Sequence, residues 1–381
     1  MSHHGPNTGR MRLGRVVAMS APVLHVRGQV LVGPDEVADE LWVVGGRVTF
    51  TRPTTPGTEV QTVEGYALPG LVDAHCHIGL GPHGEVSRDE TEQQAITDRD
   101  HGTLLVRDAG QPGDTRWIDD RDDLPKIIRA GRHIARSRRY IRNYAHEIEE
   151  DELVKHVRLE AHRGDGWVKL VGDWIDRDVG DLAPSWSRQA VADAIAAAHE
   201  EGVRVTAHCF GEESLRDLAA AGIDCIEHAT GLQEDSIDTF AAQGIAIVPT
   251  LVNIATFPAL AEPAKAKFPD YHRHMLDLHE RRFATVAAAH EAGVAIYVGT
   301  DAGGSLPHGL VAQEMAELVK AGMSHPEVLS AATWGAREWL GQPGLVEGAD
   351  ADLVVFDHDP RADIGVVADP RGVILRGRVV A

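Results

Sequence analysis

Two histidines spaced two residues apart, His75 and His77, are the first side chains that could do chemistry. They stand at the end of an apolar run that begins at Leu68. On a β-strand, residues i and i+2 point to the same face, so both imidazoles would converge on one point. Imidazole is the commonest metal ligand, and this pair would form half of a zinc-type site. In a chain with 21 histidines such a pair also occurs by chance, so further ligands are needed.

Further candidate ligands follow at the ends of later strand-like runs: Lys169, His208, His228 and Asp301. Lys169 is the least expected, because burying an ammonium in an apolar strand is costly without a partner. One interpretation is a structural ion pair with an acid such as Asp301. The other is that CO2 converts the amine to a carbamate, a carboxylate-like group able to bridge two metal ions.

The elements that position these side chains alternate between short β-branched runs and amphipathic helical stretches, the pattern of a parallel sheet with crossover helices. The expected strands are residues 70–77, 103–108, 133–137, 167–171, 203–208, 225–228, 245–249 and 294–300. Helices are expected at 92–101, 149–162, 187–201, 212–221, 233–243, 271–292, 310–321 and 326–340, while 116–129 is only weakly helical. We therefore predict an α/β fold, a (β/α)8 TIM barrel over residues 67–341, with its chemistry at the C-terminal ends of the strands.

Both ends of the chain have a different sequence pattern from the middle. Short strands are expected at residues 23–32, 40–44, 47–50, 58–63, 352–357 and 372–380, and the Gly45-Gly46 pair is a hairpin signal. We predict a small β-sandwich domain formed by both termini, residues 1–66 and 342–381.

The composition argues against some classes of binding partner. The formal net charge of −21 over 381 residues argues against nucleic acid or an anionic membrane surface, which both require basic clusters. The cysteines, Cys76, Cys209 and Cys225, are too few for a disulfide framework, so we expect a cytoplasmic protein. No stretch approaches the length of a membrane helix.

The order His75-Cys76-His77, Lys169, His208, His228 and Asp301 resembles the amidohydrolase superfamily of metal-dependent hydrolases, and Gly348 to Val354 resembles the family's return into its small β-domain. The resemblance implies that His75, His77 and Asp301 hold one divalent metal ion, His208 and His228 the second, and carboxylated Lys169 bridges them. Zinc suits these ligands, and manganese, iron, cobalt or nickel could replace it. A metal-bridging hydroxide would attack the substrate while Asp301 serves as general base and then acid, with Lys169 and His228 also at the reacting centre.

Within the superfamily, Val106-Arg107-Asp108, His208-Cys209-Phe210-Gly211, Gly299-Thr300-Asp301-Ala302 and Pro307-His308-Gly309 resemble the branch of imidazolonepropionases and prolidase-like dipeptidases. That implies hydrolysis of an amide-type C–N bond in a small molecule such as an N-acyl amino acid, dipeptide or cyclic amide; a homo-oligomer is compatible with the sequence. One alternative is a mononuclear zinc deaminase of an aminated heterocycle, with Glu212 as proton shuttle, although Glu212 is one residue beyond the usual spacing and Lys169 would be unexplained. The other is a non-catalytic relative that binds small ligands.

Candidate substrate residues follow the third expected strand and the eighth. Arg142 belongs to an arginine-rich run that could grip a carboxylate or form a solvated face. Tyr140 and Tyr144 could bond a carbonyl oxygen or simply pack, and His308 could line the pocket.

Three further expectations concern the surroundings of the site. Arg107 and Asp108 are interpreted as members of structural ion pairs. Strand alternation predicts that the three cysteines point away from the metals toward the helices, so none is a ligand. His272, His274 and His279 are expected to be exposed on a polar helix.

Overall fold

The parallel strands form the centre of a mixed α/β fold. The structure is a computed structural model that describes residues 23–54 and 59–381, so residues 1–22 and 55–58 of the predicted terminal domain lie outside the described residues. One sheet has the order β5 (Leu71–Cys76), β8 (Thr103–Asp108) and β9 (Lys126–Arg129). The other has the order β11 (His146–Ile148), β10 (Ile134–Arg136), β12 (Trp167–Val171), β15 (Arg204–Cys209), β16 (Cys225–His228) and β17 (Ala246–Val248).

The segment before Ala302 connects these two sheets. Ile296 makes a parallel bridge to Ile247 of β17, and Ala302 makes one to Cys76 of β5. Every residue of β12 and of β16 is buried, as expected for parallel strands covered on both faces.

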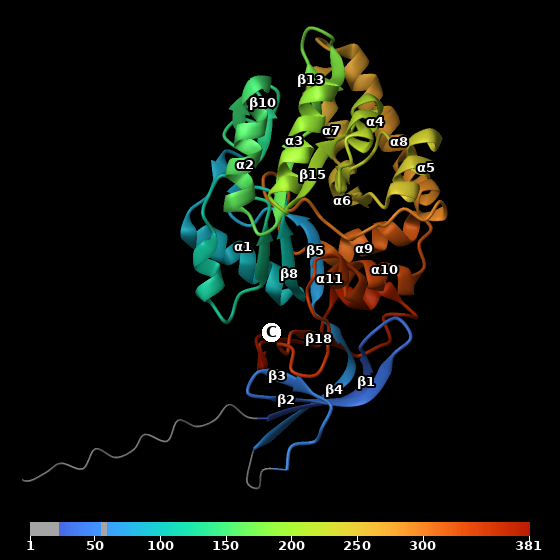
Figure 1. Cartoon of the computed structure of the whole chain (residues 1–381). Coiled ribbons are helices and arrows are strands. Elements are labelled where there is room, and N and C mark those ends of the chain that lie inside the picture. The colour runs from blue at the N-terminus through green and yellow to red at the C-terminus, as the bar shows by residue number, and fades with distance from the viewer. Residues whose placement is uncertain (1–22, 55–58) are drawn as a thin grey trace, which may run out of the picture.

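Helices lie outside the strands (Figure 1). They are α1 (Arg88–Asp100), α2 (Leu153–Arg163), α3 (Arg188–Glu200), α4 (Glu212–Ala220), α5 (Glu234–Gln243), α6 (Leu251–Ile254), α7 (Phe257–Ala261), α8 (Pro269–Glu291), α9 (Val311–Lys320), α10 (His325–Ala332) and α11 (Trp334–Trp339). Ser87 and Ser187 accept backbone N–H groups at the starts of α1 and α3, which fixes those starts one residue after a serine. No helix among the described residues is long and apolar enough to span a membrane.

A seven-stranded sheet contains strands from both ends of the chain. Its order is β20 (Arg378–Val379), β19 (Gly372–Leu375), β18 (Leu353–Phe356), β4 (Val60–Pro69), β1 (Val23–Leu31), β2 (Val37–Val44) and β3 (Arg47–Thr49). By its hydrogen bonds this is one sheet rather than two facing sheets. It lies at one end of the molecule, below β5 and β8 in Figure 1, and its own cluster of buried residues includes Leu24, Val26, Leu41 and Ile374.

Three expected elements differ from the structure, and several elements were not expected. Residues 126–129 form β9 instead of a weak helix, and residues 294–300 make only bridge contacts. Helices α6 and α7 were not predicted, and the last expected helix is divided into α10 and α11 at Thr333, whose backbone leaves helical geometry at φ −137°. Short strand pairs, β6 (Leu80–Gly81) with β7 (Gly84–Glu85) and β13 (Asp173–Asp176) with β14 (Asp181–Pro184), follow β5 and β12.

Candidate active site

His75, His77 and Asp301 meet at the end of β5. Nε2 of His75 lies 3.0 Å from Oδ1 of Asp301, Nε2 of His77 lies 2.9 Å from the same oxygen, and the two Nε2 atoms are 3.1 Å apart. The backbone holds this group together, because the N–H of Asp301 donates to the carbonyl oxygen of His75 at 2.7 Å. Asp301 has φ +60°, a left-handed conformation that costs energy in a residue with a Cβ and is frequent at functional sites.

His228 and His208 continue the cluster from β16 and β15. The His228 ring centroid lies 5.2 Å from that of His75 and 4.7 Å from that of His208. Nδ1 of His228 pairs with the Thr250 hydroxyl at 2.7 Å, which leaves Nε2 free to act as a ligand. Potential ligand atoms of His75, His228 and Asp301 all lie within 4.8 Å of one another, so this group could hold a metal ion.

Lys169 lies in the middle of β12 and is only 1% exposed. Its ammonium makes no hydrogen bond or ion pair with any described residue, Asp301 included, so the ion pair considered from the sequence does not form. Burial lowers the pKa of Lys169, although Glu227 and Asp301 oppose that shift. A buried amine with a lowered pKa and no partner requires a chemical explanation.

Two buried acids hold His75 from behind. Oε2 of Glu227 lies 2.8 Å from Nδ1 of His75, and the second oxygen of Glu227 pairs with Arg107. Asp73 accepts the backbone N–H groups of His75 and Thr300 at 3.1 and 3.0 Å and the Thr300 hydroxyl at 2.6 Å. Asp73 therefore connects the two chain segments that carry His75 and Asp301.

The electrostatics favour neutral imidazoles at His208 and His228 beside an ionised carboxylate, whereas at His75 burial is outweighed by Glu227 and Asp301, which raise its pKa. Burial lowers the pKa of His228 to about 3 and holds that of His208 well below its usual range. Burial alone would raise the pKa of Asp301, but the adjacent His75 lowers it well below the usual range. Nε2 of His208 is buried and has no hydrogen-bond partner among the described residues. Neutral imidazole with a free lone pair and ionised carboxylate are the forms that bind divalent metals.

A cavity of about 160 Å³ opens over this cluster. Its walls include the aromatic residues Tyr140, Tyr144, Trp174 and Phe210 and the aliphatic residues Leu80, Ile141, Leu260 and Leu306. No arginine or lysine lines it, so the described residues offer a substrate an apolar wall rather than a cationic clamp.

Of the four candidate substrate residues, two line the cavity and two do not. Tyr140 and Tyr144 line the cavity, and the Tyr144 hydroxyl donates to the carbonyl oxygen of Gly81 at 3.0 Å, which fixes that ring. Arg142 is exposed and does not line the cavity. His308 does not line it either, because Nδ1 of His308 bonds Asp98 at 2.8 Å on the α1 side of β5. The expectation that Arg142 and His308 contact substrate in this cavity is therefore corrected.

The cysteines follow strand alternation at two positions and not at the third. Cys76 contacts Asp98 of α1 and Cys209 contacts Asp173, away from the imidazoles. Cys225 instead lies 3.9 Å from the Arg107 guanidinium, among the residues packed between the strands, so its predicted direction was wrong. The reason is that His228 has φ +69°, which interrupts the alternation and makes Glu227 the inward residue.

Four functional candidates were missed from the sequence: Asp73, His133, Glu227 and Asn253. His133 lines the cavity with both ring nitrogens buried and without a hydrogen-bond partner among the described residues. The side-chain amide of Asn253 donates to Oδ2 of Asp301. The sequence did contain a signal for two of these acids. Asp73 lies two residues before His75, and Glu227 lies one residue before His228, each in an apolar strand.

With the geometry in place, comparison with known proteins defines the class. The model of the Amidohydrolase family matches residues 66–380. The chain is 54% identical over 356 residues to an uncharacterized protein of Mycobacterium tuberculosis, covering 93% of this chain and 95% of the relative. This chain belongs to the amidohydrolase family, which confirms the resemblance seen in the sequence; it is a hydrolase that acts on carbon–nitrogen bonds.

Two more distant relatives share the fold. Ochratoxinase of Aspergillus niger is 26% identical over 230 residues, 58% of this chain and 47% of its own length. Its crystal structure superposes with a TM-score of 0.76 at 20% identity over 94% of this chain and 96% of that one. A Xaa-Pro dipeptidase with bound methionine superposes with a TM-score of 0.77 at 22% identity over 94% and 99%. At these identities the superpositions show the common fold alone.

Proposed function

We propose that this enzyme cleaves an amide-type C–N bond at a centre of two divalent metal ions, with Lys169 carboxylated between them. One observation carries the proposal: the side chain of Lys169 is buried near Asp301 and makes no hydrogen bond or ion pair with any described residue. A lysine with a lowered pKa has the neutral amine that adds to CO2, releasing a proton and forming a carbamate. The product is an anionic, carboxylate-like group that would ligate the divalent metal ions of this site.

The donor set fits the metals that the family implies. His75, His77 and Asp301 would hold one ion, His208 and His228 the second, and the Lys169 carbamate both; zinc suits imidazole and carboxylate ligands. Bound metals would supply an activated water and polarise the scissile carbonyl. No cysteine takes part in this assignment.

Residues of the chain itself would orient the metal ligands and transfer protons during the reaction. Asp301, held by Asn253, is placed to accept the proton of the attacking water and to return it to the leaving amine. Thr250 fixes the ring of His228, and Glu227 that of His75. The ring centroids of Tyr140 and Trp174 lie 4.9 Å apart. These two rings would form an apolar wall that packs against the substrate side chain and excludes water from the site.

The fold supports the remaining parts of the proposal. The parallel strands β5 to β17 and the bridges through residues 294–302 are compatible with a (β/α)8 barrel over residues 67–341, and the joint terminal sheet with a separate β-domain over 1–66 and 342–381. The three cysteines are free, in keeping with the cytoplasmic location predicted from the sequence.

The walls favour a substrate class. This chain resembles an ochratoxinase and a Xaa-Pro dipeptidase, and the second name denotes hydrolysis of the peptide bond of a dipeptide that ends in proline. A small cavity with aromatic and aliphatic walls favours an apolar side chain on a compact substrate such as a dipeptide, an N-acyl amino acid or a cyclic amide. A mononuclear deaminase is less well supported, because Glu212, its candidate proton shuttle, pairs with His274 and Arg281 instead.

Metal stoichiometry tests this proposal. Wild type and Lys169→Ala are purified with bicarbonate and without chelator, and metals per chain are measured by elemental analysis. We expect two metals in wild type and at most one in the variant, while Lys155→Ala on the exposed face of α2 keeps two. One metal in wild type, indifferent to Lys169, would contradict the carbamate bridge and make aminated heterocycles the library to screen.

A further inference from the structure

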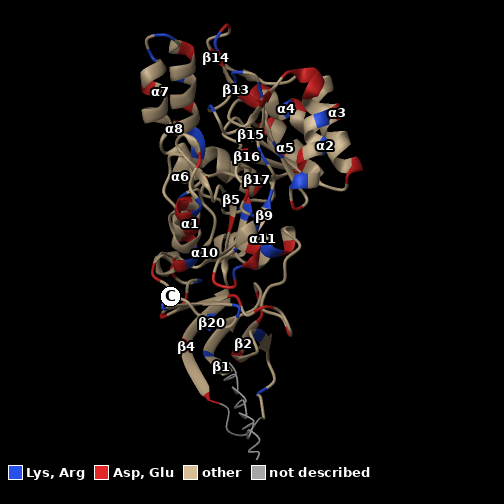
Figure 2. Ribbon diagram, turned by 90° about the vertical axis from the view of Figure 1, so that its left-hand side faces the viewer, with Lys and Arg blue, Asp and Glu red and all other residues tan. Residues whose placement is uncertain are grey.

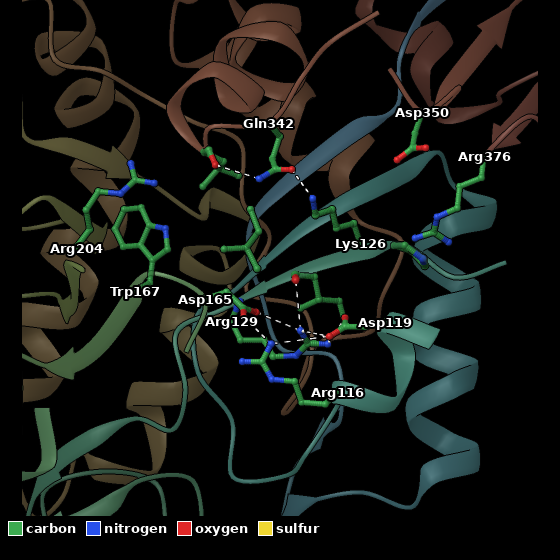
Figure 3. A pocket seen from close by; sticks show the side chains of 14 residues that line it. Arg116, Asp119, Lys126, Arg129, Asp165, Trp167, Arg204, Gln342, Asp350 and Arg376 are labelled. Carbon is green, nitrogen blue, oxygen red and sulfur yellow. Dashed lines mark hydrogen bonds and ion pairs between the residues drawn. The ribbon is translucent and has the colours of Figure 1, made fainter. Parts of the chain in front are cut away.

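A second, larger pocket of about 450 Å³ lies at the opposite end of the parallel strands from the candidate metal residues. Trp167 is the first residue of β12 and Arg204 the first of β15, whereas Lys169 and His208 lie further along the same two strands. Arg376, which follows β19 of the terminal sheet, closes the pocket from the other side (Figure 3). β9 borders it in the middle of the molecule, above the terminal sheet in Figure 2.

The lining is rich in cations although the protein is strongly acidic. It contains Arg116, Lys126, Arg129, Arg204 and Arg376 against Asp119, Asp165 and Asp350. All three carboxylates are already neutralised: Asp119 and Asp165 pair with Arg129 at 2.8 and 3.1 Å, and Asp350 pairs with Arg47 at 2.8 Å. The acids of this pocket therefore leave some of its positive charge uncompensated.

That charge belongs to Lys126, Arg204 and Arg376. Among the described residues, none of the three has a carboxylate within ion-pair distance. Their recorded side-chain hydrogen bonds go to neutral oxygens only: Lys126 to Gln342 at 2.5 Å, Arg204 to the carbonyl of Trp339 at 2.8 Å, and Arg376 to the carbonyls of Arg121 and Leu124 at 2.7 and 3.2 Å. In a chain with net charge −21, three unpaired cations around one pocket are unexpected.

The arginines are also held in place before any ligand arrives. The Arg204 guanidinium stacks over the Trp167 ring at 4.0 Å, and a single N–H bond to Trp339 leaves other donors free. Burial and the nearby Arg107 lower the pKa of Arg204, so its charged form would gain from an anion. A guanidinium fixed by stacking loses little entropy when it binds, which favours recognition of oxyanions.

We propose that this pocket binds a small phosphate-bearing molecule, with the phosphate accepting from Lys126 while Arg204 and Arg376, on either side of Lys126 (Figure 3), supply further positive charge. Phosphate has more acceptor oxygens and more charge than a single carboxylate, and therefore suits a pocket lined by three unpaired cations. A volume of about 450 Å³ is within the range of pockets for metabolite-sized ligands. This site is separate from the candidate metal centre and does not depend on the proposed function.

Calorimetric titration of the metal-loaded protein with orthophosphate and with glycerol phosphate tests this proposal. Sodium chloride at matched ionic strength controls for screening. The decisive variant is Lys126→Gln, because Lys126 is exposed and, among the described residues, its ammonium bonds Gln342 alone. We expect saturable binding to wild type that weakens about tenfold in Lys126→Gln and is unchanged in Lys155→Gln, an exposed lysine on α2.

Comparing the affinities of the two ligands shows whether the site recognises free phosphate or a phosphorylated metabolite. Equal affinities would support recognition of the phosphate group itself, and tighter binding of glycerol phosphate would support a phosphorylated metabolite. The midpoint of thermal unfolding should rise with ligand concentration in wild type and less in Lys126→Gln. Binding no stronger than that of chloride, or binding that Lys126→Gln leaves unchanged, would overturn the proposal.

Discussion

Arg107 and Glu227 form an ion pair in which both side chains have no exposed surface and Nη2 lies 2.7 Å from Oε1. Arg107 comes from β8 and Glu227 from β16, and the other oxygen of Glu227 lies 2.8 Å from Nδ1 of His75. The pair therefore joins two distant strands directly behind a candidate metal ligand. It matches the structural ion pair expected for Arg107, although the sequence did not show its partner.

Replacing Glu227 by Gln should reduce both stability and metal affinity. The substitution leaves the Arg107 guanidinium charged and buried, which costs about 3–5 kcal/mol of unfolding free energy. It also weakens the group that orients His75, so metal affinity should fall roughly 10- to 100-fold. Urea unfolding and metal titration measure the two effects.

The double variant Arg107→Met with Glu227→Gln separates these roles. Removing the unpaired charge should restore much of the stability but not the metal affinity, because His75 still lacks its carboxylate. Wild-type metal affinity in the double variant would contradict an orienting role for Glu227.

His274 should make the stability of the protein fall at alkaline pH. It lies between Asp181 and Glu212, 3.0 Å from each, and the bond to Glu212 and then that to Asp181 raise its pKa to about 9. The folded-state pKa is above the unfolded value of about 6.5, so the stabilisation is complete below pH about 6.5 and is lost as pH rises through 9. The loss should reach at most about 3 kcal/mol.

Urea unfolding of wild type and His274→Gln between pH 6 and 9.5 measures this contribution. Their free energies should differ at pH 6 and converge by pH 9.5. His162→Gln, at a histidine of α2 that is 73% exposed, should follow wild type throughout. Parallel profiles of wild type and His274→Gln would show that the charged imidazole contributes nothing.

The candidate metal ligands could be predicted because they depend only on the two-residue alternation of a β-strand and on a few residue types. The six candidate ligands were found at the ends or in the middle of strands whose apolar character is local. Glu227 was missed because alternation was counted from His228, whose left-handed backbone changes the phase. His274 was expected to be exposed because α8 is polar, yet its partner Asp181 lies 93 residues earlier, and no local pattern indicates that contact.

β9 was missed for a related reason. Lys126 and Arg129 begin and end this strand, so its four residues lack the apolar run that identified β8 and β12. Arg129 is nevertheless almost fully buried, because Asp119 and Asp165 neutralise it. Such an ion-paired strand is specified by tertiary contacts rather than by its own hydrophobicity.

His133→Phe should lower activity without removing metal. The His133 ring lies in the cavity wall, 5.2 Å from the His77 centroid, and its nitrogens have no partner among the described residues, so they are available to a substrate oxygen. Loss of one such hydrogen bond in the transition state should cost about 100-fold in kcat/KM on the best amide substrate. His133→Asn, which keeps polar atoms, should recover part of that loss. Equal rates in wild type and His133→Phe would make His133 a packing residue.

Gly299→Ala should displace His75, because a Cβ at this position has no space. It would stand 2.7 Å from both the Cβ and the backbone nitrogen of His75 and 2.3 Å from a methyl carbon of Val248. Real Cβ atoms do not approach so closely, so β5 must move, at a cost of about 1–3 kcal/mol. Movement of β5 carries His75 and His77 away from Asp301.

Gly344→Ala is the matched control, since a Cβ there meets no atom within 4 Å and its backbone is not left-handed. Thermal unfolding and metal content should be unchanged in Gly344→Ala and reduced in Gly299→Ala. If Gly299→Ala keeps full metal content while its stability falls, the close approach at Gly299 serves only packing, and the position of His75 depends on its bonds to Glu227, Asp73 and Asp301.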